Sequence, residues 1–155
     1  MAKDTKEIME EISELLKEGK QINEKIKKLI IRLEKQNEDK ETNELDSIIF
    51  DFLNKVGIPT NVSGYRYLQK TLKLTINNDD YLLVTKKLYP KLAKEFKVKA
   101  SSIERGIRTA IELGCHRHGR MYEVFEDIIN KDTGTPTNAQ FISFATQKLK
   151  IENGL

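Results

Sequence analysis

The side chains best suited to sequence-specific recognition lie together between residues 101 and 109. They combine hydroxyl, carboxylate and guanidinium groups: Ser101, Ser102, Glu104, Arg105, Arg108 and Thr109. An arginine can donate two hydrogen bonds to guanine O6 and N7, and a carboxylate can accept one from cytosine N4. These residue types therefore indicate contacts to base edges in the DNA major groove, provided that one helix presents them together.

Two short helices joined by a tight turn are predicted over residues 89–114. Pro90 suits the first turn of the first helix, because a residue there needs no N–H donor. Ser101 and Glu104 have the spacing of a capping box at the start of the second helix, and Gly114 is expected to end it. The buried stripe of the second helix is predicted to consist of Ile103, Ile107, Ala110 and Ile111.

This pair is typical of a helix-turn-helix, whose second helix lies in the major groove and reads bases from its N-terminal half. Lys97 occupies the turn, where many such motifs have glycine. Two alternatives stay open at the level of single residues. Glu104 could serve only as the capping residue. Arg105 and Arg108 could contact phosphates, which adds affinity without sequence information.

Positive charge is concentrated around this predicted motif. The net charge is only +3, but residues 66–120 contain 13 basic and 5 acidic side chains. A surface that binds phosphates requires such an excess, although a solvated lysine-rich surface would look similar. The candidate phosphate contacts are Arg66, Lys70, Lys94, Lys97, Lys99, Arg117 and Arg120.

Residues 1–36 are predicted to form a coiled-coil helix. Their apolar residues alternate steps of three and four, with Gly19 as the one weak position in the seam. The seam residues proposed for self-association, with a dimer favoured, are Ile8, Ile12, Leu15, Ile22, Ile26, Leu29 and Leu33. A single amphipathic helix folded back on its own domain is the alternative.

The remaining chain is predicted to be all-α. Residues 37–44 lack apolar side chains and are expected to form a linker or a frayed helix end, followed by a DNA-binding domain over 45–155. Helices are expected near 45–56, 65–76, 81–88, 122–129 and after 138. The residues expected to point to the core are Tyr81, Leu82, Val84, Thr85 and Leu88 in the helix at 81–88, and Phe141, Ile142, Ala145 and Leu149 in the last helix. The aromatic residues assigned to the core are Tyr65, Tyr67, Phe125, Phe141 and Phe144.

Several function classes are disfavoured. The residues show no phosphate loop, paired-carboxylate site or catalytic triad, so we expect neither an enzyme nor a cofactor. Cys115, His116 and His118 lack the spacing of zinc ligands, and no metal site is predicted. A single cysteine suits a reducing cytoplasm, and no apolar run approaches the length of a membrane span.

Four phrases carry a resemblance to a known family. They are VGIPTNVSGYRYL (56–68), TKKLYPKLAKEF (85–96), KASSIERGIRTAIE (99–112) and PTNAQFISFATQKLKIE (136–152). In this order they resemble the C-terminal DNA-binding effector domain of the sporulation-initiation master response regulator of endospore-forming bacteria. The resemblance implies a six-helix bundle that binds paired TGTCGAA-type boxes in double-stranded DNA.

The family's base-reading residues fall on Ser101, Glu104, Arg105 and Arg108. Ser102 and Thr109 stand where the family has arginine and histidine, which affects the preferred box. Residues 119–135 are rewritten relative to the family segment that touches RNA polymerase. The N-terminal residues also depart, because the family carries a phosphoacceptor receiver domain there and a coiled coil replaces it in this chain.

The sequence therefore predicts a cytoplasmic, sequence-specific regulator of transcription that associates constitutively rather than on phosphorylation. Its expected partners are DNA, a second copy and, through the family segment, RNA polymerase or a related regulator. Two alternatives remain. The first is a plasmid or phage accessory or partition protein that binds DNA. The second is a protein-interaction adaptor that antagonises a full-length regulator.

Overall fold

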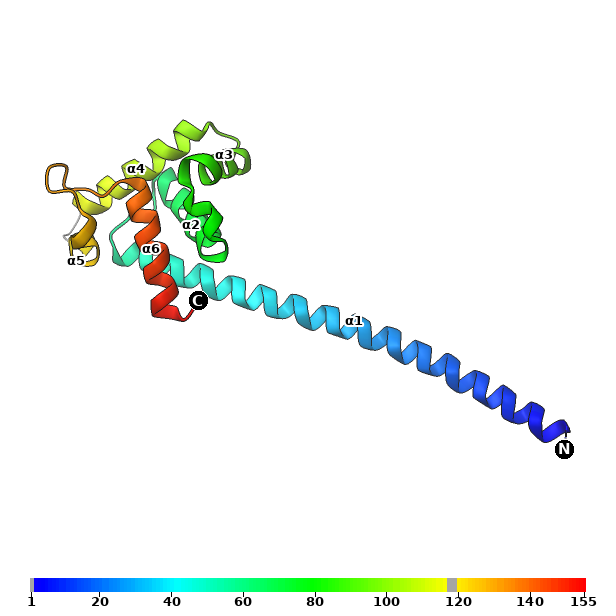
Figure 1. Ribbon diagram of the computed structural model, residues 1–155. Coiled ribbons are helices and arrows are strands. Elements are labelled where there is room, and N and C mark those ends of the chain that lie inside the picture. Colours follow the sequence, from blue (N-terminus) through cyan, green and yellow to red (C-terminus); the bar gives the residue numbers. More distant parts are fainter. Residues whose placement is uncertain (1, 117–119) are drawn as a thin grey trace. The chain divides into compact units, whose positions relative to one another are not determined.

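The computed structural model describes residues 2–116 and 120–155. Within these residues the chain is helical and contains no strand, which confirms the all-α prediction (Figure 1). The α-helices are α1 (Ala2–Lys55), α2 (Ser63–Asn77), α3 (Tyr89–Phe96), α4 (Ala100–His116), α5 (Arg120–Phe125) and α6 (Asn138–Asn153). Shorter helical segments are the 3₁₀ helices η1 (Asp79–Leu82) and η3 (Glu126–Ile128) and the π-helix η2 (Val84–Leu88).

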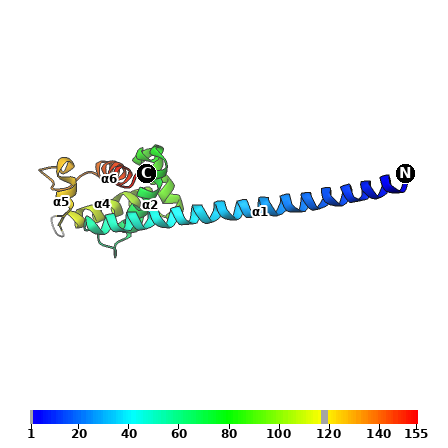
Figure 2. The same cartoon turned by 90° about the horizontal axis from the view of Figure 1, so that it is seen from below.

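The chain divides into two compact units at the boundary between Asn43 and Glu44. We call the part of α1 before this boundary the N-terminal helix, and residues 44–155 the effector unit. The boundary lies inside α1, which Figures 1 and 2 show as one unbroken helix.

Residues 37–44 are therefore helical: they were expected to form a linker or a frayed helix end, and the helix instead continues through them. The segment contains three Glu, two Asn, one Asp, one Lys and one Thr, and no Gly or Pro. Glu and Lys have good helix propensity, and no Gly or Pro interrupts the helix, so α1 continues through the segment despite the less favourable Asn, Asp and Thr.

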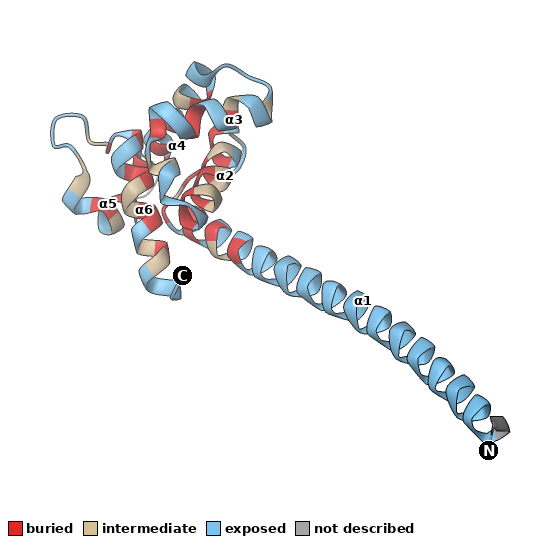
Figure 3. Ribbon diagram, turned by 45° about the vertical axis from the view of Figure 1, so that its right-hand side comes forward, coloured by how far each residue is buried: buried red, intermediate tan, exposed pale blue. Residues whose placement is uncertain are grey.

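The N-terminal helix has no core of its own. Every described side chain from residue 4 to residue 44 is exposed, and burial begins at Leu45 (Figure 3). An isolated helix in water gains little from propensity alone, and most helical stability in proteins comes from packing an apolar face.

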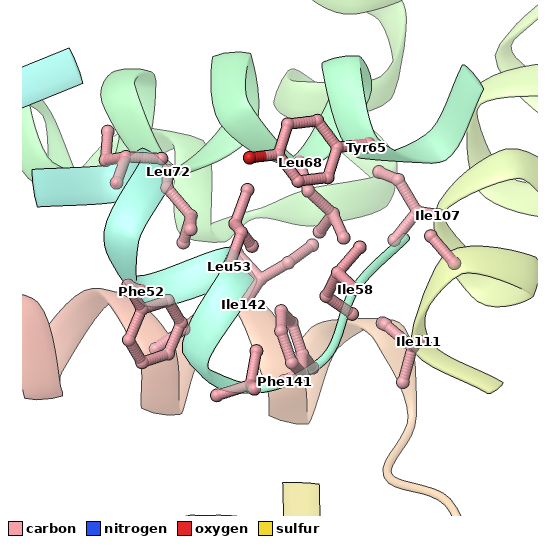
Figure 4. Packing of buried hydrophobic residues seen from close by; sticks show 14 of the residues in the cluster. Phe52, Leu53, Ile58, Tyr65, Leu68, Leu72, Ile107, Ile111, Phe141 and Ile142 are labelled. Atoms are coloured by element: carbon pink, nitrogen blue, oxygen red, sulfur yellow. The ribbon is translucent and has the colours of Figure 1, made fainter. Parts of the chain in front are cut away.

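The effector unit is built around one apolar core. Residues 45–55 of α1 pack with α2, α4 and α6, and Figure 4 shows Leu53, Leu68, Ile107 and Ile142 converging from these four helices. A buried hydrogen bond of 2.7 Å between the hydroxyls of Thr75 and Thr146 links α2 to α6 inside this core. The core positions predicted on α6 are confirmed: Phe141, Ile142, Ala145 and Leu149 are buried.

One expected helix takes a different form. Residues 81–88 were predicted to form a single helix, but a 3₁₀ turn and a π-helical segment replace it. Leu83, between them, has a non-helical backbone with φ −74° and ψ 70°. Only Val84 and Leu88 of the predicted inward residues are fully buried, and Thr85 is exposed. The break in register at Leu83 rotates Thr85 away from the core.

Candidate nucleic-acid interface

The turn between α3 and α4 depends on an unusual backbone conformation at Lys97. Lys97 has φ 56° and ψ 43°, the left-handed region that glycine usually occupies after a helix. In this conformation its N–H and that of Val98 both donate to the carbonyl of Ala93. The turn therefore closes α3 without glycine, and α4 begins three residues later, at Ala100.

The start of α4 differs from the sequence prediction. The N–H groups of Ser102 and Ile103 donate to the carbonyl of Lys99, so the helix already includes Ser101. The predicted capping box of Ser101 and Glu104 was therefore wrong, because a residue inside the first turn cannot serve as the N-cap. The Glu104 carboxylate pairs with Arg108 instead.

The end of α4 also differs, because the helix continues through Gly114 to His116. A Cβ atom at Gly114 would lie 2.8 Å from Met121 Cε and 2.9 Å from Ile58 Cδ1. Gly114 is therefore a packing residue rather than a helix stop, since a larger residue would displace the ends of these two side chains.

The exposed side of α4 presents the predicted base-reading residues together. Its buried stripe is the predicted one, with Ile103, Ile107, Ala110 and Ile111 at 0–1% exposure. On the other side Glu104 is half-buried and the remaining candidates are exposed: Ser101, Ser102, Arg105, Arg108 and Thr109. Nothing from the described effector unit covers this side, so a duplex can approach it.

A pair of glycines sets the position of α4 against α2. A Cβ atom at Gly64 would lie 2.0 Å from the carbonyl oxygen of Gly106, and one at Gly106 would lie 2.8 Å from Tyr67 Cε2. The two backbones therefore touch where these helices cross. Neither glycine was singled out from the sequence, although an isolated glycine inside a strong helical pattern is a known signal of close packing.

This crossing leaves a depression beside the N-terminal half of α4. Its volume is about 500 Å³, and its lining comes from the start of α2 and from α4: Val62, Ser63, Gly64, Ser101, Ser102, Arg105, Gly106 and Thr109. Arg105 lines it, and no ion pair or hydrogen bond within the described residues engages its guanidinium. Arg105 is therefore free to meet an acceptor supplied from outside.

Arg108 and Glu104 form an ion pair with each other on the surface of α4. Arg108 Nη2 lies 2.7 Å from Glu104 Oε1, and their side chains are 60% and 45% exposed. An exposed i,i+4 pair contributes no more than about 0.5 kcal/mol, so exchanging it for DNA contacts costs little. Until such an exchange, the pair keeps the guanidinium in a defined orientation on the exposed side of α4.

Asn138 holds three helices together behind this surface. Its side-chain amide donates to Tyr89 Oη at 2.9 Å and to the carbonyl of Glu104 at 3.0 Å. The start of α6 is thereby tied to α3 and to the first turns of α4. Burial raises the pKa of the Tyr89 phenol, which therefore stays neutral at physiological pH. From the sequence, position 138 was expected only to mark the start of the last helix, and this role of Asn138 was not predicted.

The predicted phosphate contacts differ in how available they are. Lys94, Lys97, Lys99 and Arg120 are exposed. Lys70 is engaged with Glu95 at 2.7 Å, an ion pair that links α2 to α3. The guanidinium of Arg66 lies 5.9 Å from the centre of the Phe96 ring. Arg117 lies outside the described residues.

The cysteine and histidine cluster does not form a shared site among the described residues. Cys115 is buried and His116 is exposed, while His118 lies outside the described part. Burial raises the pKa of the Cys115 thiol to about 11, so the group is a neutral core side chain at pH 7. No set of three or more metal-ligating side chains gathers within the described residues.

Two further observations concern the whole described chain. No helix in residues 2–116 or 120–155 is both long and apolar enough to span a bilayer. Residues 49–149 match the family model described as "Sporulation initiation factor Spo0A C terminal". The match covers well over half of the 155 residues and includes α2 to α5, the turn between α3 and α4, and most of α6.

Proposed function

The chain belongs to the family of the Spo0A C-terminal domain, a DNA-binding effector of sporulation regulators, and on that premise we propose that α4 reads base sequence in the major groove. The function proposed is that of a sequence-specific transcriptional regulator. The family assignment itself covers only DNA binding of the effector type. The reading helix, its residues and the mode of association are the proposal.

The observation that carries this proposal is the uncovered side of α4. Arginine, serine and glutamate side chains line its N-terminal half, which is the part of a recognition helix that reaches base edges. Arg105 beside the depression is the best placed to donate two hydrogen bonds to a guanine. Ser102 and Thr109 flank it and would adjust the preferred box.

The exposed lysines next to α4 would supply the affinity that does not depend on sequence. Lys94, Lys97 and Lys99 lie on α3 and in the turn, at the same end of α4 as the base-reading candidates. Each cation that meets a phosphate releases counterions, which makes binding depend on salt. Their role is to hold the reading helix in register on the duplex.

Association through the N-terminal helix completes the proposal. Two linked effector units gain effective concentration on paired boxes without any new base contact. Association through this exposed apolar helix face would then make DNA binding constitutive. If the apolar face instead recruits a full-length regulator, the chain acts as an antagonist, and the exposed seam supports that second candidate.

Selection of bound sequences from random duplex DNA tests this function. The wild-type protein should enrich one motif, and Arg105→Ala should bind that motif with a free energy weaker by about 1–3 kcal/mol and discriminate less at one position. Lys86→Ala is the matched control, because it removes one exposed positive charge from η2 rather than from α4. It should leave the enriched motif unchanged.

Two results would contradict the proposal. Salt-sensitive binding without any enriched motif would leave only non-specific affinity and would favour the adaptor. An equal loss for Arg105→Ala on the selected box and on scrambled DNA would assign Arg105 to the phosphate backbone. If a motif is enriched, a reporter gene downstream of it separates a regulator of transcription from an accessory or partition protein.

A further inference from the structure

The N-terminal helix exposes a continuous apolar face that no part of its own unit covers. Its seam residues are between 47% and 61% exposed, with Ile26 the least and Leu15 the most exposed. Three further apolar residues widen the face along one side of the seam: Met9, Leu16 and Ile30. A helix with this much exposed apolar surface is not a stable end state in water.

The charges along this helix have opposite signs in its two halves. Residues 7–18 carry five acidic side chains and one basic one, whereas residues 25–36 carry five basic and one acidic. The first half therefore has a charge of −4 and the second a charge of +4. Parallel, in-register association would place like charge beside like charge along the whole helix, while antiparallel association would place each half against its complement.

The positions flanking the seam show the same preference. If Ile12 and Ile26 occupy heptad position a, position g holds Glu11, Glu18, Lys25 and Arg32, and position e holds Met9, Leu16, Asn23 and Ile30. In a parallel pair each g residue faces an e residue, so these charges would meet mainly apolar side chains. In an antiparallel pair g faces g and e faces e, because one helix is reversed.

We propose that the partner of the N-terminal helix is a second copy of the same helix in antiparallel orientation. One register fits all seam positions: Ile8 faces Leu33 of the second copy, Ile12 faces Leu29, Leu15 faces Ile26, and Gly19 faces Ile22. The same register places Glu11 opposite Arg32 and Glu18 opposite Lys25, which are the pairings that set orientation in coiled coils. This inference rests on the self-association included in the proposed function and specifies its geometry.

Gly19 supports this register independently of charge. A Cβ atom built at Gly19 meets nothing within 4 Å, so packing within its own helix does not require a glycine at this position. In a parallel, in-register dimer two glycines would share one layer and leave a hole in the seam. In the antiparallel register each glycine faces the larger Ile22, and the layer on either side is filled by aliphatic residues.

The four charged flanking residues are also available for the second copy. Within the described residues, the ion pairs of this helix join Lys6 to Glu10 and Lys27 to Glu24, and neither uses a g position. Glu11 has Glu7 and Glu14 as its i−4 and i+3 neighbours, and Arg32 has Lys28 and Lys35. Like-charged neighbours on the same helix are mutually destabilising, and an opposite charge from another chain relieves this repulsion.

Orientation decides where the chain enters its two effector units. In the proposed register the two Asn43 residues would stand roughly 70 Å apart, since a helix rises 1.5 Å per residue. In a parallel dimer they would be roughly 10 Å apart, the usual distance between packed helix axes. The two arrangements therefore predict different spacings between the DNA boxes that one dimer can occupy.

Disulfide crosslinking of the full chain distinguishes the orientations. In a Cys115→Ala background, Ile8→Cys and Leu33→Cys are oxidised separately and as a mixture in which one variant carries a mass tag. We expect a disulfide only in the mixture, joining residue 8 to residue 33. Separately, each pair of identical cysteines would lie roughly 38 Å apart, beyond the 4.4–6.8 Å between Cα atoms that a disulfide needs.

Charge reversal gives a second measurement without cysteine. The double variant Glu11→Lys, Glu18→Lys should raise the dimer dissociation constant roughly 10–100-fold at low salt, because four attractive pairs become repulsive. Adding Lys25→Glu and Arg32→Glu reverses the sign of every g position and should restore most of the affinity. In a parallel dimer the quadruple variant would gain nothing from g-to-g pairing.

Each possible failure has its own meaning. Disulfides within the separate samples would show a parallel dimer and overturn the orientation, while DNA selection could still succeed. A dimer that forms no disulfide in any sample would overturn the register. A monomer in sedimentation at micromolar concentration would overturn self-association as well. A crosslink between residues 8 and 33 with no enriched DNA motif would overturn the proposed reading helix and leave this inference standing.

Discussion

Helix α1 belongs to both units of the chain, and its apolar side chains are buried in one portion and exposed in the other. In residues 45–55 the apolar side chains Ile49, Phe52 and Leu53 are 1%, 6% and 0% exposed, because they belong to the apolar core of the effector unit. Earlier in the same helix, Ile26 and Leu29 are 47% and 58% exposed. The periodicity is similar in both portions, but only residues 45–55 have apolar side chains that are buried within their own unit.

This contrast separates two sources of helix stability. The effector unit contains the elements that bury its apolar faces, so its stability does not depend on protein concentration. The apolar face of the N-terminal helix is not buried within its own unit, so under the proposed association the stability of this helix would depend on protein concentration. Mutations in the two regions should therefore alter different measured quantities, and this distinction leads to four predictions.

The largest difference is expected between two leucines on opposite sides of the boundary. Leu72→Ala should lower the free energy of unfolding of the effector unit by about 2–5 kcal/mol, because Leu72 is 0% exposed. Leu29→Ala should change it by less than about 0.5 kcal/mol and weaken association instead. Urea denaturation followed by tyrosine fluorescence measures the first effect, since all five tyrosines lie in the effector unit. Equal effects of the two variants on unfolding would remove the distinction.

Two glycines provide the next comparison. Gly64→Ala should destabilise the effector unit by about 3 kcal/mol, since the new Cβ would lie 2.0 Å from a backbone oxygen of α4 that cannot rotate away. Gly19→Ala should instead raise the helicity of the N-terminal helix, with a gain of about 1 kcal/mol in propensity. Far-ultraviolet circular dichroism during thermal unfolding measures both. A neutral Gly64→Ala would mean that α2 and α4 can separate without cost.

Removing the hydrogen bonds that Asn138 donates behind α4 should have a smaller effect on stability. Asn138→Ala leaves Tyr89 Oη and the Glu104 carbonyl without the side-chain amide and should cost about 1–3 kcal/mol of effector-unit stability. Tyr89→Phe removes only one of these two hydrogen bonds and should cost less. Denaturant titration of both variants measures the difference. If Tyr89→Phe costs as much as Asn138→Ala, the bond to α4 contributes nothing.

The smallest effect concerns pH and Cys115. Burial raises the pKa of this thiol from 9.0 to about 11, so the unfolded state releases the proton first as pH rises. Its contribution to stability is therefore complete below pH 9 and is lost as pH rises towards 11. Subtracting the pH profile of Cys115→Ala from that of the wild type should isolate this loss from those of Tyr65 and Tyr89, whose pKa values burial also raises. A flat difference between pH 9 and 11 would contradict the assignment.

The sequence could predict most of the secondary structure because apolar periodicity is local information. The buried stripe of α4 and the core positions of α6 are as predicted. Helix ends were less predictable, since they depend on which hydrogen-bond partners the terminal backbone N–H and C=O groups find in the neighbouring turns. Residues 37–44 are helical because no Gly or Pro interrupts α1 there, whereas the non-helical backbone at Leu83 divides the segment 81–88 that was predicted to be one helix.

For the candidate interface, the residue types on one face of α4 follow from helical spacing alone. Their environment does not. The Glu104–Arg108 pair, the engagement of Lys70 by Glu95 and the depression beside Arg105 all require the packed arrangement of α2, α3 and α4. The role of Asn138 joins residues 34 and 49 positions apart in the chain, which no local pattern reveals.

The amino-acid sequence by itself therefore determined the helical class, the family, the charge asymmetry and the faces that each helix presents, because these depend on residue type and on spacing within one element. Only the tertiary structure decided which faces find partners within the chain. It brought Gly64 against Gly106, buried Cys115 and left the N-terminal seam uncovered within its own unit. The physical reason is that burial depends on contacts between residues far apart in sequence, whereas periodicity depends only on near neighbours.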